Sequence, residues 1–137
     1  MNAEDYVSYE VAKLLKEKGY NHYEKQHYFT EDIHVGDGTT IKGKSLTEMF
    51  HLWDDFNDFK IYAPSLWDAA KWLREEHQVD VISRLEFDDE DYGYGKDICI
   101  GYGFDIYKDK ELVDFSIGFD TYEQALNEGI SRALNLI

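Results

Sequence analysis

Apolar residues recur at helical spacing in four parts of the chain. Across residues 8–18 they form one stripe. Either Ser8, or Asn2 with Asp5 three positions later, is placed to cap the start of the helix, and Gly19 is placed to end it. Three more amphipathic helices are expected at about 46–53, 65–77 and 121–136. Each of these follows a Ser or Thr that has an acidic or amide residue three positions later, a spacing typical of helix starts.

Between the last two helices the pattern changes to alternation of apolar and polar residues. Alternation with a period of two residues is typical of a strand with one buried face. The apolar positions are Val79, Val81, Leu85 and Phe87, then Ile98, Ile100, Tyr102, Phe104 and Ile106, then Val113, Phe115, Ile117 and Phe119. The connections are short enough for antiparallel neighbours. We therefore expect a three-stranded antiparallel meander over about 78–119, with its apolar face packed against the helices.

These elements predict an α+β fold in a single domain, residues 1–137. Extra short strands are expected in 22–42, around a turn at Gly36-Asp37-Gly38. The 43% hydrophobic content and 16% aromatic content of the 137 residues are sufficient for one core.

The charge limits the partners that this protein can bind. Its 29 acidic and 14 basic side chains give a net charge of -15. This field repels phosphate backbones and anionic membranes, so we expect no direct nucleic-acid binding and no membrane binding. A basic protein surface is the partner that the charge favours. Cys99 is the single cysteine, and the acidic N-terminus lacks the pattern of a secretory signal, so we expect a cytoplasmic protein.

The densest acidic cluster falls at the expected turn between the first two meander strands. Its candidate interaction residues are Glu86, Asp88, Asp89, Glu90, Asp91, Tyr92 and Tyr94. The cluster does not fit a calcium loop, because Tyr94 stands at the sixth position, which needs glycine, when counting begins at Asp89. Gly93-Tyr94-Gly95 lacks the third glycine and the helix of a dinucleotide-binding motif. We interpret the cluster as a protein-interaction surface.

No pattern in the chain predicts catalytic, cofactor-binding or metal-binding residues. The five histidines lack the spacing that places two imidazoles on one helical face. Cys99 lies on an alternating strand with no histidine nearby in sequence, and we expect it to be a small packing residue. The helix–strand order of residues 65–137 is that of a double-stranded-RNA-binding domain, but the last helix begins without Lys or Arg to contact phosphates.

Three parts of the chain resemble small uncharacterised proteins of gut Bacteroidales and of their associated phages and mobile elements. The resemblance is carried by residues 7–19, by residues 62–66 with 71–75, and by residues 122–126 with Gly129-Ile130 and Ala133-Leu134. These stretches are mainly helix caps and apolar stripes. The resemblance implies an accessory protein of a phage or mobile element, and it implies no particular activity.

Three hypotheses for function follow. The first is a non-enzymatic acidic accessory protein that binds another protein, including a form that mimics nucleic-acid charge in order to inhibit a host protein. The second is a small metal-dependent enzyme that uses His and Asp or Glu side chains brought together only by the fold. The third is a homo-oligomer that pairs through an edge of the meander.

Overall fold

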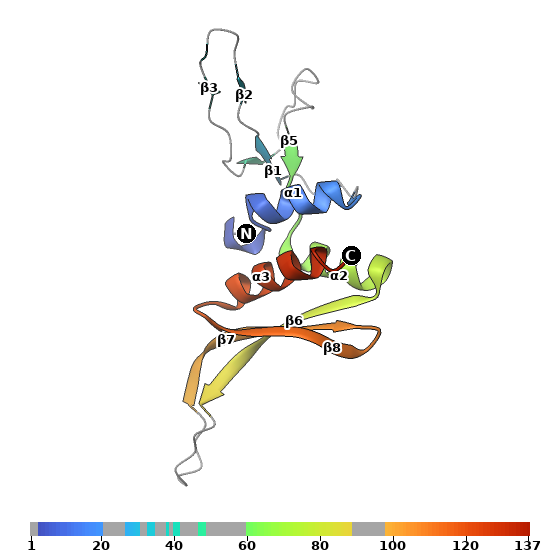
Figure 1. Cartoon of the computed structure of the whole chain (residues 1–137). Helices are drawn as coiled ribbons and strands as arrows, with labels where there is room; N and C mark the ends of the chain where they lie inside the picture. Colours follow the sequence, from blue (N-terminus) through green and yellow to red (C-terminus); the bar gives the residue numbers. More distant parts are fainter. Residues whose placement is uncertain are drawn as a thin grey trace. The chain divides into compact units, whose positions relative to one another are not determined.

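The computed structural model describes residues 3–20, 27–30, 33–34, 38, 40–41, 47–48, 60–88 and 98–137. These residues form an α+β fold, which confirms the predicted class. Contacts divide the chain into two compact units, Met1–Asp68 and Ala69–Ile137. Figure 1 shows their elements. The single domain expected from the sequence stays a prediction.

The first unit contains two small antiparallel sheets. One has the strand order β4-β1-β5, formed by Thr47–Glu48, His27–Thr30 and Lys60–Tyr62. The other pairs β2, Ile33–His34, with β3, Thr40–Ile41. Of the turn expected at Gly36-Asp37-Gly38, only Gly38 is among the described residues. The short strands predicted in 22–42 are therefore confirmed.

The helix predicted at about 46–53 is wrong at its start. Thr47 pairs with Tyr28, and Glu48 pairs with His27, in an antiparallel ladder. The predicted helix had only about two turns, and a helix that short has little stability of its own in water. Pairing with β1 decides the conformation of Thr47 and Glu48. The rest of the predicted helix lies outside the described residues.

The first helix, α1 (Tyr9–Glu17), has the start and end that the sequence predicts. The Oγ atom of Ser8 accepts a hydrogen bond from the Val11 N–H at 3.4 Å. Gly19 follows the helix with a φ of 93°, a conformation that glycine adopts without strain. The helix packs beside β5, and the N–H of Val7 donates to the carbonyl of Pro64 at 3.1 Å.

The second helix, α2 (Leu66–His77), begins at the Ser65 cap predicted for it. Ser65 Oγ accepts from the Asp68 N–H at 3.1 Å and donates to Asp68 Oδ2 at 2.9 Å. The predicted stripe of Leu66, Ala69, Ala70 and Leu73 is buried. This helix confirms the expected region 65–77.

The second unit contains the predicted meander and one helix on it. Strands β6 (Val79–Asp88), β7 (Ile98–Lys108) and β8 (Glu111–Phe119) form an antiparallel sheet in the order β6-β7-β8. The last helix, α3 (Tyr122–Leu134), contacts all three strands and lies across one face (Figure 1). We call this covered side the inner face and the opposite side the outer face.

Small residues let α3 lie close to the inner face. A Cβ atom added at Gly129 would lie 2.6 Å from Val81 Cγ1 and 3.0 Å from Phe104 Cγ. Phe104 and Ile106 of β7 are fully buried, as is Ile130 of α3. The core of this unit therefore forms where the middle of the helix crosses the centre of the sheet.

One buried polar residue, Ser83, interrupts the apolar alternation of β6. Its hydroxyl donates to the backbone carbonyl of Tyr122 at 2.9 Å. The N-terminus of α3 is capped separately, since Thr121 Oγ1 accepts from the Gln124 N–H at 3.1 Å. Gln124 Oε1 in turn accepts from the Asp120 N–H. Ser83 thus joins the sheet to the first turn of the helix.

Leu85 and Phe87, expected in the core, are exposed instead. At 1.5 Å per residue the 13 residues of α3 span about 20 Å, whereas the 10 residues of β6 span about 33 Å at 3.3 Å each. The ribbon of β6 and β7 extends beyond the end of the helix (Figure 1). Apolar residues at that end, including Ile100, have no helix over them.

The prediction that Phe115 and Ile117 face the core is also wrong. Phe115 pairs with Asp105, which pairs with Ile82, and these positions lie on the outer face. Phe119, by contrast, lies on the inner face, 5.7 Å from Phe104 between ring centroids. The register shifts between Tyr102 and Gly103, where Gly118 has a φ of 95°. An extra residue in one strand moves the side chains that follow to the other face.

Candidate functional site

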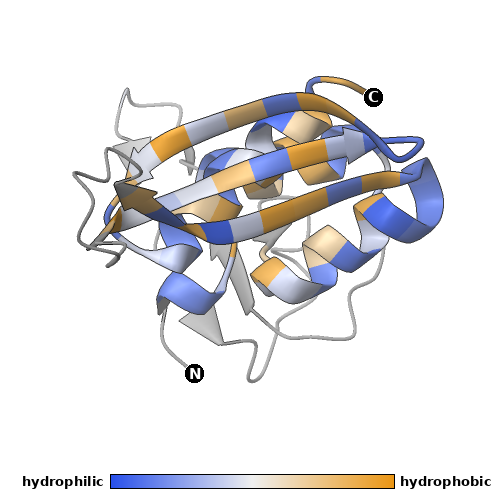
Figure 2. Ribbon diagram, turned by 90° about the horizontal axis from the view of Figure 1, so that it is seen from below, coloured by the Kyte–Doolittle hydropathy of each residue, from blue (hydrophilic) through white to orange (hydrophobic). Residues whose placement is uncertain are grey.

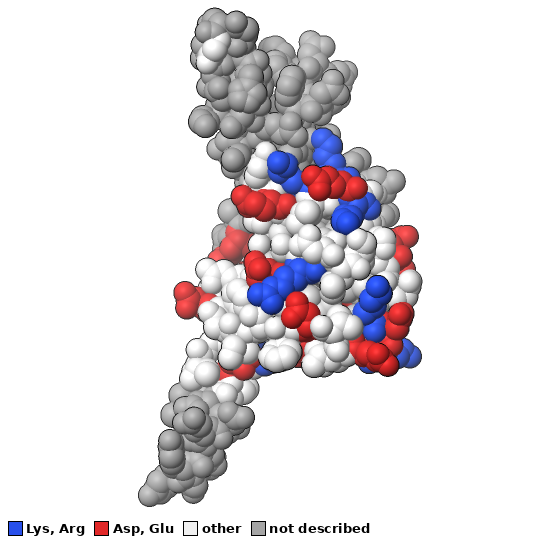
Figure 3. All heavy atoms as spheres, viewed as in Figure 1, with Lys and Arg blue, Asp and Glu red and all other residues white. Residues whose placement is uncertain are grey.

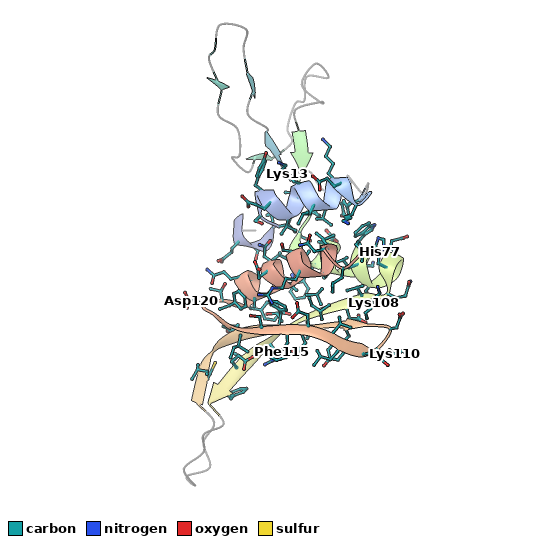
Figure 4. All side chains as sticks on the ribbon, in the orientation of Figure 1. Lys13, His77, Lys108, Lys110, Phe115 and Asp120 are labelled. Carbon is teal, nitrogen blue, oxygen red and sulfur yellow. The ribbon has the colours of Figure 1, made fainter. Side chains whose placement is uncertain are left out.

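The outer face of the β6-β7-β8 sheet is the candidate functional surface. The register places its residues in three rows across the strands, which are Arg84, Gly103 and Ile117, then Ile82, Asp105 and Phe115, then Asp80, Tyr107 and Leu112. Figure 2 views the sheet from this side, with apolar and polar positions next to one another. Phe115 lies on the side away from α3 (Figure 4).

Large apolar side chains are exposed on this face. The exposed fractions are 47% for Ile82, 51% for Leu112, 59% for Phe115 and 55% for Ile117. Single exposed apolar residues are common on protein surfaces, but several gathered on one face of a sheet are typical of an interaction surface. The strands fix these side chains in place, so binding to them costs little backbone ordering.

A charged cluster lies beside the apolar residues. Arg84 donates from Nε to Asp105 Oδ2 at 2.8 Å and from Nη1 to Glu86 Oε1. The side chains of Glu86 and Asp105 are 14% and 17% exposed, while that of Arg84 is 35% exposed. The hydrogen bond to Asp105 raises the pKa of Arg84 above its usual value. Arg84 therefore stays charged, and both carboxylates are held along the sheet.

The glycine opposite Arg84 makes room for the Glu86 carboxylate. A Cβ atom at Gly103 would lie 2.5 Å from Glu86 Oε1 and 2.6 Å from the Ser116 carbonyl oxygen. Gly103 thus has a structural role within β7.

The edge strand β8 is partly protected against pairing with another strand. The backbone N–H of Phe115 donates to Asp114 Oδ1 at 2.8 Å. Asp114 is held in turn by Arg132 of α3, with Nη1 and Oδ2 3.6 Å apart. An added strand would need that N–H as a donor. This favours the outer face over the β8 edge as the binding surface.

The acidic cluster predicted from sequence is only partly described. Glu86 lies on β6 and is engaged with Arg84. Its part in a protein-interaction surface stays a prediction. Asp88 is the last residue of β6. The remaining predicted interaction residues, Asp89, Glu90, Asp91, Tyr92 and Tyr94, lie outside the described residues. On the face shown in Figure 3, acidic and basic side chains of the described part are interspersed.

The other candidates for chemistry are metal ligands, the histidines and Cys99. Within residues 3–20, 60–87 and 99–137, no three His, Cys, Asp or Glu side chains lie close enough to hold a metal ion together. Of the five histidines only His77 has a described side chain, and its ring lies 4.7 Å from that of Trp72. Cys99, expected to be a small packing residue, is exposed.

None of the described helices combines the length and the apolar character that are needed to cross a membrane. The longest, α3, has 13 residues, against about 20 for a typical span.

Sequence reasoning missed the outer face for an identifiable reason. The regular alternation in β8 predicts one buried face that carries Val113, Phe115, Ile117 and Phe119 together. Gly118 within an apolar strand is the signal that could have revealed the bulge. Ile82, which stands out of phase with Val79 and Val81, is the second signal.

No family model, no curated protein and no solved structure matches this chain.

Proposed function

We propose that this protein is a non-enzymatic protein-binding module that engages its partner through the outer face of the β6-β7-β8 sheet. The supporting observation is the exposure of Ile82 on β6 and of Phe115 and Ile117 on β8, all on the same face of the sheet. The charged cluster of Arg84, Glu86 and Asp105 adds polar groups to this face, with Asp105 on the central strand between Ile82 and Phe115. Protein interfaces typically combine apolar and polar contacts.

The apolar contribution to binding has a definite scale. Complete burial of one Leu, Ile or Phe side chain is worth about 1.5–3 kcal/mol. Four half-exposed side chains would therefore contribute about 3–6 kcal/mol, before about 4 kcal/mol or more is lost to the entropy of association. A partner must add polar contacts to reach useful affinity. Arg84, whose side chain is 35% exposed, is placed to make such contacts.

The role in the cell is proposed on sequence grounds. The resemblance to small proteins of gut Bacteroidales, their phages and mobile elements supports an accessory role there. The single cysteine supports a cytoplasmic setting. Mimicry of nucleic-acid charge and metal-dependent catalysis remain alternatives that no feature of the described residues favours.

A capture experiment tests the proposed surface. The immobilised protein is compared with Phe115→Glu and Ile117→Glu variants, in lysate and with the purified protein as the soluble ligand. Leu136→Glu is the matched control, because Leu136 is 43% exposed and follows α3 rather than lying on the sheet. We expect capture by the unmodified protein and the control, and loss of capture by the two sheet variants. Equal capture by all four proteins would refute the proposed surface.

A further inference from the structure

We infer that the outer face of the sheet binds the outer face of a second copy of this chain, with the strands of the two copies antiparallel. This inference rests on the proposed function and names the partner. It is carried by the order of the three rows on the face, which is complementary to itself when reversed. Interfaces between identical chains most often have such two-fold symmetry.

The complementarity follows from the register. Consider a two-fold axis that runs across the strands and passes through the row of Ile82, Asp105 and Phe115. Rotation about this axis reverses the strand direction and places β6 over β6. The row containing Arg84 and Ile117 then faces the second copy's row containing Asp80 and Leu112.

The contacts made in this way are favourable in both charge and polarity. Arg84 faces the second copy's Asp80, and the same pair forms again on the other side of the axis. Ile117 faces the second copy's Leu112, while Ile82 and Phe115 each face their own counterparts. All four apolar side chains are about half-exposed in the single chain and would be covered.

The central row also contains Asp105, which would approach the second copy's Asp105. Its carboxylate accepts from Arg84 Nε and its side chain is 17% exposed, so the nearby guanidinium offsets its charge.

The alternative two-fold axis, parallel to the strands, is less favourable. It would place β6 over β8 and bring Arg84 against the second copy's Ile117. A guanidinium covered by an aliphatic side chain loses hydration without gaining a charged partner. The reversed arrangement avoids this, and stacked sheets of this kind lie about 10 Å apart with their side chains interleaved.

The first experiment measures mass against concentration by sedimentation equilibrium. We expect a monomer–dimer equilibrium for the unmodified protein. Ile82→Glu and Phe115→Glu should each weaken the dimer at least about tenfold, because each places carboxylates at the axis. Leu136→Glu, the exposed control outside the face, should leave the equilibrium unchanged. Thermal melts of all variants establish that they are folded.

The second experiment tests the predicted pair by charge exchange. Asp80→Arg sets two cations opposite each other, and Arg84→Asp sets two anions opposite each other, so each variant alone should dimerise at least about tenfold more weakly. A mixture of these two variants restores both opposite-charge pairs. We expect the mixed dimer to form about tenfold or more tightly than either variant with itself. A purely structural role for either residue would not produce this recovery.

Two outcomes would overturn the inference. One is a monomer at every concentration up to about 1 mM, the range that covers weak association. The other is a dimer that is insensitive to Ile82 and Phe115 or shows no recovery in the mixture. If the protein is monomeric and captures a different protein in a Phe115-dependent manner, this inference fails and the proposed function stands. Capture that is independent of Phe115 and Ile117 would remove the proposed surface.

Discussion

Arg132 of α3 and Asp114 of β8 form an ion pair, with Nη1 and Oδ2 3.6 Å apart. The other carboxylate oxygen of Asp114 accepts the backbone N–H of Phe115 at 2.8 Å. The helix on the inner face therefore holds the side chain that engages a backbone donor of the edge strand. The packing of α3 thus contributes to the protection of the β8 edge.

Replacing Asp114 with Ala should expose the Phe115 amide on the edge strand β8, with only a small effect on the free energy of unfolding. Both partners of the ion pair are more than a third exposed, so we expect a loss of at most about 1 kcal/mol in the free energy of unfolding. The amide of Phe115 should exchange with solvent faster than in the unmodified protein, as measured by NMR hydrogen exchange. An unchanged rate for this amide would show that Asp114 does not protect it in solution.

Replacing Gly129 with Ala should destabilise the second unit. The new Cβ would lie 2.6 Å from Val81 Cγ1. Overpacking of a core typically costs about 1–3 kcal/mol, which exceeds the gain of about 1 kcal/mol in helix propensity. Urea denaturation measures the difference. Ser131→Ala, on the same helix and outside the core, is the control and should change stability by less than about 0.5 kcal/mol.

Replacing Arg84 with Met should destabilise the sheet by about 1 kcal/mol. Two carboxylates with low exposure lose their partner, and the loss is reduced because the guanidinium is a third exposed. Asp105→Asn in the same background should cost less than in the unmodified protein, since the pair acts as a unit. Strictly additive losses in this cycle would contradict coupling between the two side chains.

The stability lost in Arg84→Met should depend on pH in a direction that the pKa of Arg84 determines. The folded protein raises the pKa of Arg84 through its hydrogen bond to Asp105. A raised pKa of a base contributes stability that is complete below the unfolded pKa and is lost as the pH rises through the folded pKa. The difference in unfolding free energy between the unmodified protein and Arg84→Met should therefore be constant between about pH 6 and pH 9. A decline within that range would contradict this assignment.

The three helix caps, Ser8, Ser65 and Thr121, should contribute unequally to the stability of the fold. Ser65 and Thr121 each accept an N–H at 3.1 Å, whereas Ser8 accepts one at 3.4 Å. We expect a loss of about 1 kcal/mol for Ser65→Ala and for Thr121→Ala, and a smaller loss for Ser8→Ala. Chemical denaturation of the three variants orders them. Ser8→Ala as the most damaging of the three would contradict this ranking.

Local chemistry in the sequence was sufficient to place most elements. The caps at Ser8, Ser65 and Thr121 and the stop at Gly19 define three helices, because each acts within one turn of its own position. Alternation with a period of two defined three long strands and their antiparallel order. Thr47 is the exception, because its pairing with Tyr28 outweighs a weak local preference for helix.

Only the tertiary structure decided which side of the sheet each apolar residue occupies. Alternation predicts that neighbouring residues of a strand point to opposite faces of the sheet, but it does not predict which face a helix covers. The bulge at Gly118 sends Phe115 and Ile117 to the outer face and Phe119 to the inner face. The limited length of α3 leaves Leu85 and Phe87 uncovered. The candidate surface depends on strand register and helix coverage, which are properties of distant contacts and not of local sequence.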